Sequence, residues 1–179
     1  MNKKMILSLI IIALAAFIGI ALYKAAGLKS IQIVKSVTIK GTKGEVFDMV
    51  RYLNNYPKWS PFLVQDPTQK YEVKGTDGTV GARYHWHGNK GKDLGYQEIS
   101  KIDTFNFVGI KCIIQKPFVA EPTFDYTFKE TANGIQVTQN FNVQSGSVDG
   151  LFMWLFGIRG KMEETNQQGL DLLKKAIEK

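Results

Sequence analysis

The chain has 179 residues, 44% of them hydrophobic, which suffices for one domain with a sizeable core plus a short extra segment. Its net charge is +7, but the basic residues are scattered, with Lys174-Lys175 the only adjacent pair beyond the N-terminus, so no nucleic-acid-binding surface is expected. The single cysteine, Cys112, excludes an internal disulfide and a cysteine-based metal cluster.

The N-terminal segment is predicted to span a membrane. From Met5 to Tyr23 the chain carries no charge, and as a helix this stretch would rise about 28 Å, close to the ~30 Å hydrocarbon thickness of a bilayer. A cleaved signal peptide is the alternative, because Ala25-Ala26-Gly27 offers small residues for cleavage. The apolar run exceeds the roughly 7–15 residues of a signal-peptide core, which favours a retained single-pass anchor.

The chain is expected to divide into two parts. Residues 1–29 would form a short tail and the anchor, and residues 31–179 one soluble domain. The short tail before the span favours an N-terminus in the cytosol and a domain on the extracytoplasmic side. The lysines that follow the span either meet anionic lipid headgroups or are simply solvated: Lys24, Lys29, Lys35, Lys40 and Lys43.

The soluble part opens with a strand and a capped helix. Gln32 to Lys40 alternates with period two, which predicts a strand. Thr42 and Glu45 form a capping box, and apolar residues at helical spacing follow as far as Leu53. Residues 57–61, which contain two prolines, are expected to add at most one further turn.

Six short alternating runs follow, separated by turn residues. They predict strands over Lys70–Lys74, Gly81–His87, Gly95–Ile102, Asn106–Gln115, Thr123–Glu130 and Ile135–Val143. Because one face of most runs is apolar and the other polar, the sheet is expected to be antiparallel with one dry face.

The C-terminal stretch from Leu151 to Lys179 predicts one long amphipathic helix. Its apolar stripe would lie on the dry face of the sheet, which gives an α+β architecture. The middle of that stripe carries the small residues Thr165 and Gly169. They indicate either close backbone packing or room for a ligand.

Several local motifs occur in a fixed order along the domain. They are Ser36–Ile39, Glu45–Phe47, Trp59–Phe62, Gly81–Trp86, Gly95–Ile99, Gly157–Met162 and Gly169–Lys174. This order resembles the SRPBCC superfamily, which includes START lipid-transfer domains, birch-pollen-allergen-like proteins and the polyketide cyclase/dehydrase-like family. The resemblance covers Gln32 to Lys179 and implies a helix-grip fold, in which a curved antiparallel sheet wraps around a long C-terminal helix. It also implies a deep apolar cavity between them, and usually no metal; no cofactor is expected.

Eight residues are predicted to line this cavity, because they are aromatic residues of the predicted strands and short helix or small residues facing them from the C-terminal helix: Trp59, Tyr84, Trp86, Phe124, Tyr126, Phe141, Thr165 and Gly169. For any one aromatic residue, a place in the ordinary core is the alternative.

Other chemically capable residues suggest no reaction. His85 and His87 share a strand face at a spacing that a metal can use, but no cysteine or third histidine completes a ligand set, and the face is opposite to Tyr84 and Trp86. Asp93 and Glu98 are either acid–base groups or solvated charges. Cys112 is expected to be a core thiol. No catalytic residue is assigned.

Two functions therefore remain open, and a third is kept beside them. The first is a membrane-anchored domain that binds a lipid or hydrophobic small molecule, and the second is a cyclase-like enzyme acting on an apolar substrate. Polar groups inside the cavity would favour the enzyme, and a wholly apolar wall the binding protein. The third, a protein-interaction module, would have no cavity. The sequence does not determine an oligomeric state.

Overall fold

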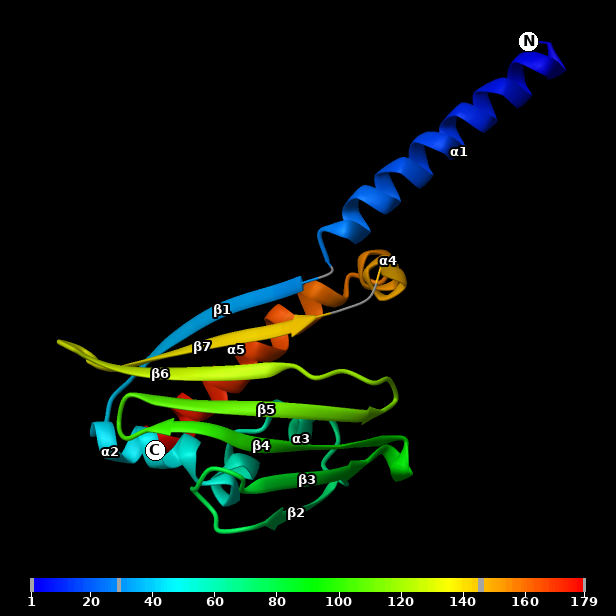
Figure 1. Cartoon of the computed structure of the whole chain (residues 1–179). Coiled ribbons are helices and arrows are strands. Elements are labelled where there is room, and N and C mark those ends of the chain that lie inside the picture. The colour runs from blue at the N-terminus through cyan, green and yellow to red at the C-terminus, as the bar shows by residue number, and fades with distance from the viewer. Residues whose placement is uncertain (1, 29, 145–146, 179) are drawn as a thin grey trace.

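The computed structural model describes residues 2–28, 30–144 and 147–178 (Figure 1). A long N-terminal helix, α1 (Lys3–Ala26), projects from a domain in which one seven-stranded antiparallel sheet curves around the C-terminal helix, α5 (Ile158–Ile177). The predicted α+β architecture is therefore confirmed. The boundary expected near residue 29 falls on Lys29, which lies outside the described residues, and the division into two parts stays a prediction.

The sheet has the strand order β1-β7-β6-β5-β4-β3-β2, and every pair is antiparallel. Each strand ends within two residues of its predicted limits: β1 (Ser30–Ile39), β2 (Lys70–Lys74), β3 (Arg83–Gly88), β4 (Asp93–Asp103), β5 (Phe107–Lys116), β6 (Thr123–Thr131) and β7 (Gly134–Gln144). The outer strands β1 and β2 lie at opposite edges, and α5 packs most closely along β1.

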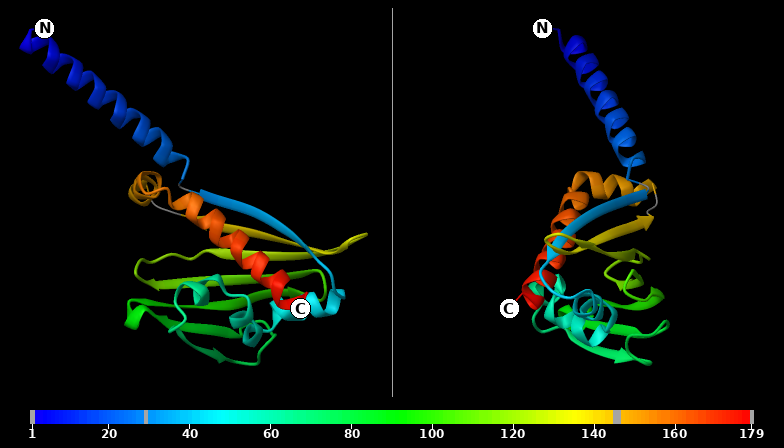
Figure 2. Two further views of the ribbon diagram at one scale, coloured as in Figure 1. Left: turned by 180° about the vertical axis from the view of Figure 1, so that it is seen from behind. Right: turned by 90° about the vertical axis from the view of Figure 1, so that its left-hand side faces the viewer.

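The single helix predicted from Leu151 onwards is in fact two helices, α4 (Ser147–Leu155) and α5, which meet at a sharp turn (Figure 2). Gly157 makes this turn with φ 61° and ψ 30°, a left-handed conformation that glycine adopts without steric cost. Leu155, expected on the buried stripe, is 53% exposed. The prediction of one continuous helix was wrong because α4 packs against α1 rather than continuing along the sheet.

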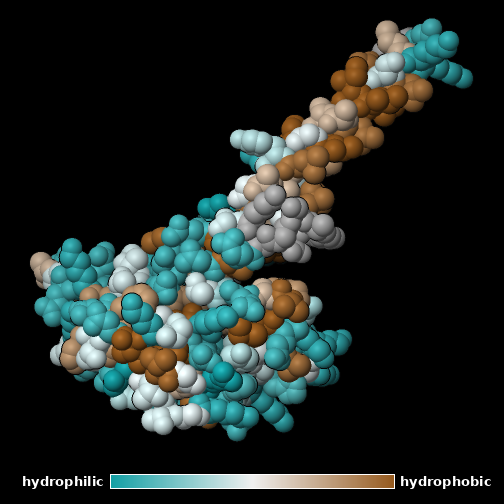
Figure 3. All heavy atoms as spheres, in the orientation of Figure 1, coloured by the Kyte–Doolittle hydropathy of each residue, from teal (hydrophilic) through white to brown (hydrophobic). Residues whose placement is uncertain are grey.

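The contact between α4 and α1 is close. A Cβ on Gly150 would fall 2.6 Å from the backbone oxygen of Ala25, and the ring of Trp154 lies 6.1 Å from that of Phe17. Ala21 and Ala25 are consequently buried. The rest of α1 is apolar on all sides and exposed, and Figure 3 shows it as a mostly brown rod leaving a mostly hydrophilic domain.

Three short helices connect β1 to β2. The capping box of α2 (Lys43–Arg51) is formed as predicted, with the Glu45 carboxylate accepting a hydrogen bond of 2.9 Å from the Thr42 amide. Residues 57–61 themselves hold no more than the one turn expected, but helices that were not predicted extend from them on both sides. A 3-10 helix, η1 (Leu53–Lys58), runs through Pro57, and α3 (Pro61–Gln65) begins with proline at a position that needs no amide hydrogen. These turns carry Tyr56 and Trp59 under the sheet.

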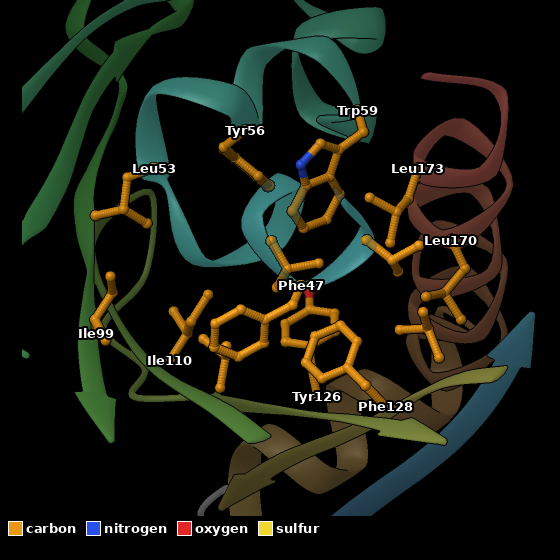
Figure 4. Packing of buried hydrophobic residues seen from close by; sticks show 14 of the residues in the cluster. Phe47, Leu53, Tyr56, Trp59, Ile99, Ile110, Tyr126, Phe128, Leu170 and Leu173 are labelled. Carbon is orange, nitrogen blue, oxygen red and sulfur yellow. The ribbon is translucent and has the colours of Figure 1, made fainter. Parts of the chain in front are cut away.

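The core lies between α2, the C-terminal half of α5 and the sheet (Figure 4). The rings of Phe47 and Phe128 meet edge to face at 5.4 Å, and Leu170 and Leu173 reach the same cluster from α5. Leu173 is fully buried. The C-terminal half of α5 is therefore fixed on the core, and its N-terminal half is left to bound the site described next.

Candidate ligand-binding cavity

A cavity of about 370 Å³ lies between the concave face of the sheet and the N-terminal half of α5. This volume falls in the range of small-molecule sites in proteins, about 300–1,000 Å³. All eight residues predicted from the sequence line it: Trp59, Tyr84, Trp86, Phe124, Tyr126, Phe141, Thr165 and Gly169. The structure thus brings them together around one space, although their part in binding stays a proposal.

The strand register arranges the lining in two sets, one on β3, β4 and β5 and one on β6 and β7, which are offset because Ile110 faces Phe124 across β5 and β6. The residues nearest the loop between β5 and β6 are mainly apolar: Trp86 and Ile114 in the first set, Phe124 and Phe141 in the second. Two residues further along each strand lie Tyr84, Gln97 and Cys112 in the first set and Tyr126 and Gln139 in the second, and we call these five residues together the polar row. Two residues further again, the strands carry Ala82, Ile99, Ile110, Phe128 and Val137, which belong to the core and do not line the cavity. The polar row is buried and borders the core, so it is the floor of the cavity.

Trp86 is held against the wall by its neighbours on β4. Its indole Nε1 donates a hydrogen bond of 2.9 Å to the Asp93 carboxylate. A Cβ on the facing residue, Gly95, would fall 2.4 Å from the indole ring and 2.3 Å from the backbone oxygen of Ile113. Only glycine leaves room for the ring to lie across β4.

The small residues on α5 lie beside both α3 and the cavity. A Cβ on Gly169 would lie 3.6 Å from the ring of Pro61, an ordinary contact distance, so α5 packs against α3 here but the approach does not require glycine. Gly169 and Thr165 also line the cavity. Space for a ligand and close helix packing coexist because α3 covers only part of this face.

Exposed lining residues mark the mouth of the cavity. They are Phe62 on α3, Pro117 and Phe118 in the loop between β5 and β6, and Lys161 near the start of α5. Phe62 is 43% exposed and Phe118 58%, and the adjacent Val119 is 83% exposed. This apolar rim lies on the side of the domain from which α1 leaves, since Ala120 packs with Trp154 against the cluster around Leu28.

The polar row is buried and uncharged. Gln139 Nε2 donates a hydrogen bond of 2.8 Å to the Tyr126 hydroxyl. Burial raises the pKa of the Cys112 thiol to about 12, and Asp93 adds to the shift. Burial also raises the pKa of Tyr84 and of Tyr126, and the nearby Tyr56 adds to both shifts. These groups therefore stay protonated at neutral pH.

Tyr56 stands opposite this row on η1. Burial raises its pKa to about 12, while hydrogen bonds with Ser60 and Gln97 act in the opposite direction. Within the described residues, two buried atoms of the row have no hydrogen-bond partner: Tyr84 Oη and Gln139 Oε1. Buried polar atoms are normally paired, so these two need an explanation.

The other residues singled out in the sequence lie outside the cavity or engage neighbours. His85 stacks near Tyr96 at 5.2 Å, and neither it nor His87 lines the cavity. Glu98 pairs with Arg83. No three His, Cys, Asp or Glu side chains in the described part of the chain are placed to hold a metal ion. A second, more open depression of about 620 Å³ follows the outer face of α5 and is lined mostly by polar and charged residues.

Sequence comparison assigns the domain to a family. Residues 30–178 match the family described as polyketide cyclase / dehydrase and lipid transport. None of the curated proteins compared with the chain matches it.

Solved structures share the fold at low sequence identity. Ms6760 from Mycobacterium smegmatis is 18% identical, with a TM-score of 0.53 over 80% of this chain and 88% of that chain. Ara h 8.0201 is 13% identical, with a TM-score of 0.58 over 83% of this chain and 97% of that chain. The di-domain ARO/CYC StfQ from the steffimycin biosynthetic pathway is 12% identical, with a TM-score of 0.59 over 83% of this chain and 51% of that chain.

At such identities the likeness concerns the fold alone, and it agrees with a curved sheet wrapped around α5. The family match carries the assignment, because it extends over nearly the whole domain. The chain has the helix-grip fold of the SRPBCC superfamily and belongs to its polyketide cyclase/dehydrase and lipid transport family.

Proposed function

We propose that the protein is a membrane-anchored domain that binds a hydrophobic small molecule or lipid reversibly in this cavity. The observation that carries the proposal is the cavity of about 370 Å³, whose walls above the polar row are mainly aromatic and aliphatic. An enclosed space of this kind counts against a protein-interaction module, which needs none. The lipid transport in the description of the family supports the same conclusion.

The position of the mouth supports exchange with a membrane. The exposed rim residues Phe62, Phe118 and Val119 are aromatic or aliphatic and lie on the α1 side of the domain. Lys161 stands at the same rim, where a cation suits an anionic lipid surface. A ligand leaving a bilayer would then pass the rim without crossing much water.

Membrane anchoring by α1 is the part of the proposal that rests on the length and composition of one helix. In the described part of the chain, one helix, Lys3–Ala26, is long and apolar enough to cross a membrane, and a signal sequence near the N-terminus would satisfy the same criteria. N-terminal sequencing of the mature protein separates the two, because a start near Leu28 would contradict a retained anchor. The side of the membrane on which the domain lies stays a prediction, which protease access to intact cells or spheroplasts tests.

The binding proposal is tested on the domain without residues 1–27. We expect lipid or another apolar molecule to be found with it by native mass spectrometry, and fluorescent retinol, an uncharged probe, to bind. Thr165→Phe should fill the cavity and abolish probe uptake with little loss of stability, whereas Glu164→Phe, on the exposed outer side of α5, should leave uptake unchanged. Wild-type protein that carries nothing and takes up no probe would contradict the proposal.

A cyclase-like enzyme is the second candidate, and the polar row is the observation that favours it. Aligned hydroxyl and amide groups can orient a polyfunctional substrate and stabilise an enolate oxygen. However, the raised pKa values of Cys112 and the tyrosines leave them without basic character at neutral pH. Among the described residues the one lining carboxylate, Asp93, accepts the hydrogen bond of Trp86. Reversible binding therefore accounts for the site better than catalysis does, because binding does not require a general base in the cavity.

A further inference from the structure

We propose that the ligand enters with an uncharged, hydroxyl-bearing end first, which hydrogen-bonds to the polar row at the floor, where Tyr84 Oη and Gln139 Oε1 lack partners among the described residues, and leaves its hydrocarbon chain toward the mouth. This inference rests on the proposed function and specifies its ligand class. It would make the protein selective for neutral amphiphiles such as long-chain alcohols or monoacylglycerols over fatty acids and hydrocarbons.

The first step of the argument is the order of the rows. Along each strand from β3 to β7, a position with an apolar residue or glycine lies nearest the mouth, a member of the polar row lies two residues deeper, and a core residue lies two residues deeper again. Polar groups at the mouth would be expected of any surface opening. Polar groups at the closed end, between apolar lining and core residues, are unexpected. Water is scarce there, so burying each polar group costs free energy unless it has a hydrogen-bond partner.

The second step is the pair of unpartnered atoms. Tyr84 is 1% exposed and Gln139 5%, both line the cavity, and Tyr84 Oη and Gln139 Oε1 find no partner among the described residues. An amide oxygen requires a donor, so a ligand that is only a hydrogen-bond acceptor does not satisfy Gln139. A hydroxyl group satisfies either atom, because it can donate to Gln139 Oε1 and can accept from, or donate to, Tyr84 Oη. It also fits if the amide of Gln139 is turned over, because a hydroxyl then accepts from the amide nitrogen.

The third step is charge. The polar row contains no ionised group at neutral pH, since burial keeps the Cys112 thiol and the tyrosines protonated. The one lining cation among the described residues, Lys161, is exposed at the rim, and the one lining carboxylate, Asp93, is close enough to Cys112 to raise its pKa. A carboxylate at the floor would be buried without a counter-ion and beside a like charge, which is strongly unfavourable.

The experiment measures displacement of the fluorescent probe from the domain by three ligands of similar length at neutral pH: dodecanol, dodecyl methyl ether and dodecanoate. In wild type, dodecanol should bind about tenfold more tightly than the ether, because the ether leaves the amide oxygen unpaired. It should also bind more tightly than dodecanoate.

Two variants locate the selectivity. At least one of Tyr84→Phe and Gln139→Met should reduce the preference for dodecanol over the ether several-fold while leaving the affinity for the ether nearly unchanged. Tyr71→Phe is the matched control, because its ring stacks on Tyr84 at 5.3 Å but does not line the cavity, and it should keep the wild-type preference. Melting temperatures and circular dichroism establish that each variant is folded.

The outcomes separate this inference from the function on which it rests. Probe binding with equal affinity for the alcohol and the ether, or tightest binding of dodecanoate, overturns the inference and leaves the proposed function standing. A preference that Tyr84→Phe and Gln139→Met do not change also overturns it, because the polar row would then not be the binding surface. Absence of any binding overturns both.

Discussion

At the scale of single residues, the shape of the cavity depends on a missing side chain at one glycine as much as on the aromatic rings that line it. Trp86 can lie flat on β4 and bond to Asp93 only because Gly95 has no side chain. A wall residue and its support thus come from neighbouring strands, in directly facing positions of the register.

Gly95→Ala should displace Trp86, because the new Cβ would fall 2.4 Å from its ring. We expect a loss of about 1–3 kcal/mol in the free energy of unfolding, as for other overpacked sites, together with a changed near-ultraviolet circular dichroism spectrum and weaker probe binding. Gly160→Ala is the control, since nothing lies within 4 Å of a Cβ there and alanine is favoured in a helix by up to about 1 kcal/mol. Equal melting temperatures for the two variants would show that the close approach at Gly95 is unimportant.

The raised pKa values predict loss of stability at alkaline pH. In the folded state the pKa values of Cys112 and Tyr56 are about 12, above the values of about 8.5 and 10 expected in the unfolded chain, and those of Tyr84 and Tyr126 are raised too. The unfolded state releases these protons first, so stability is fully present below about pH 8.5 and falls between there and about pH 12. Thermal unfolding at a series of pH values measures this. The slope should be smaller in Tyr84→Phe, and a melting temperature that stays constant to pH 12 would be inconsistent with a protonated floor.

Some lining residues of the polar row, and Tyr56 opposite it, were not predicted from the sequence. Gln139 occupies the same alternation as Val137 and Phe141, and Gln97 the same as Ile99, so both had the register of the dry face. Their polarity could have identified them. A glutamine at a position that should face the apolar side of the sheet means either that the strand register was wrongly predicted or that the side chain has a function. Tyr56 carried no such signal, because its place depends on the 3-10 helix that runs through Pro57.

At the scale of elements, α5 has two halves with different surroundings. Leu170 and Leu173 fix its C-terminal half in the core, whereas Met162, Thr165 and Gly169 line the cavity. The strands were predictable to within two residues because turn residues bound each run and alternation survives in most of them. The break between α4 and α5 was not, because a continuous apolar run has no polar face to show where a helix changes its partner.

Leu173→Asp should unfold the domain, because Leu173 is fully buried and a carboxylate there has no partner. The expected cost exceeds about 4 kcal/mol, a large share of the ~5–15 kcal/mol that stabilises a typical domain. Met162→Asp, at the half-buried cavity wall, should cost less and mainly weaken binding. Lys175→Asp, at an exposed position, is the control. Denaturant titrations that give one midpoint for all three would mean that the buried face of α5 is wrongly assigned.

At the scale of the whole molecule, α1 is a packing partner of the domain as well as a candidate anchor. Its Ala21 and Ala25 are buried, and Trp154 lies beside Phe17. Whatever α1 does in a membrane, its removal uncovers the face of α4 that it covers.

Deletion of residues 1–27 should therefore leave a folded domain with an unchanged β-sheet signal but a tendency to self-associate through α4. Light scattering or sedimentation in the absence of detergent measures this, and Trp154→Ser should reduce the association without changing the fold. A monodisperse deleted protein with Trp154 intact would indicate that the contact between α1 and α4 contributes little.

The connection between α1 and the sheet limits how far the cavity can travel. Only residues 27–29 separate Ala26 from Ser30, and three residues span at most about 11 Å. With α1 in a bilayer, this short connection keeps the mouth of the cavity close to one leaflet of one membrane. Such a protein cannot carry a ligand across an aqueous gap between two membranes. It can extract a molecule from its own leaflet, hold it shielded from water, and wait for a soluble carrier or enzyme to collect it.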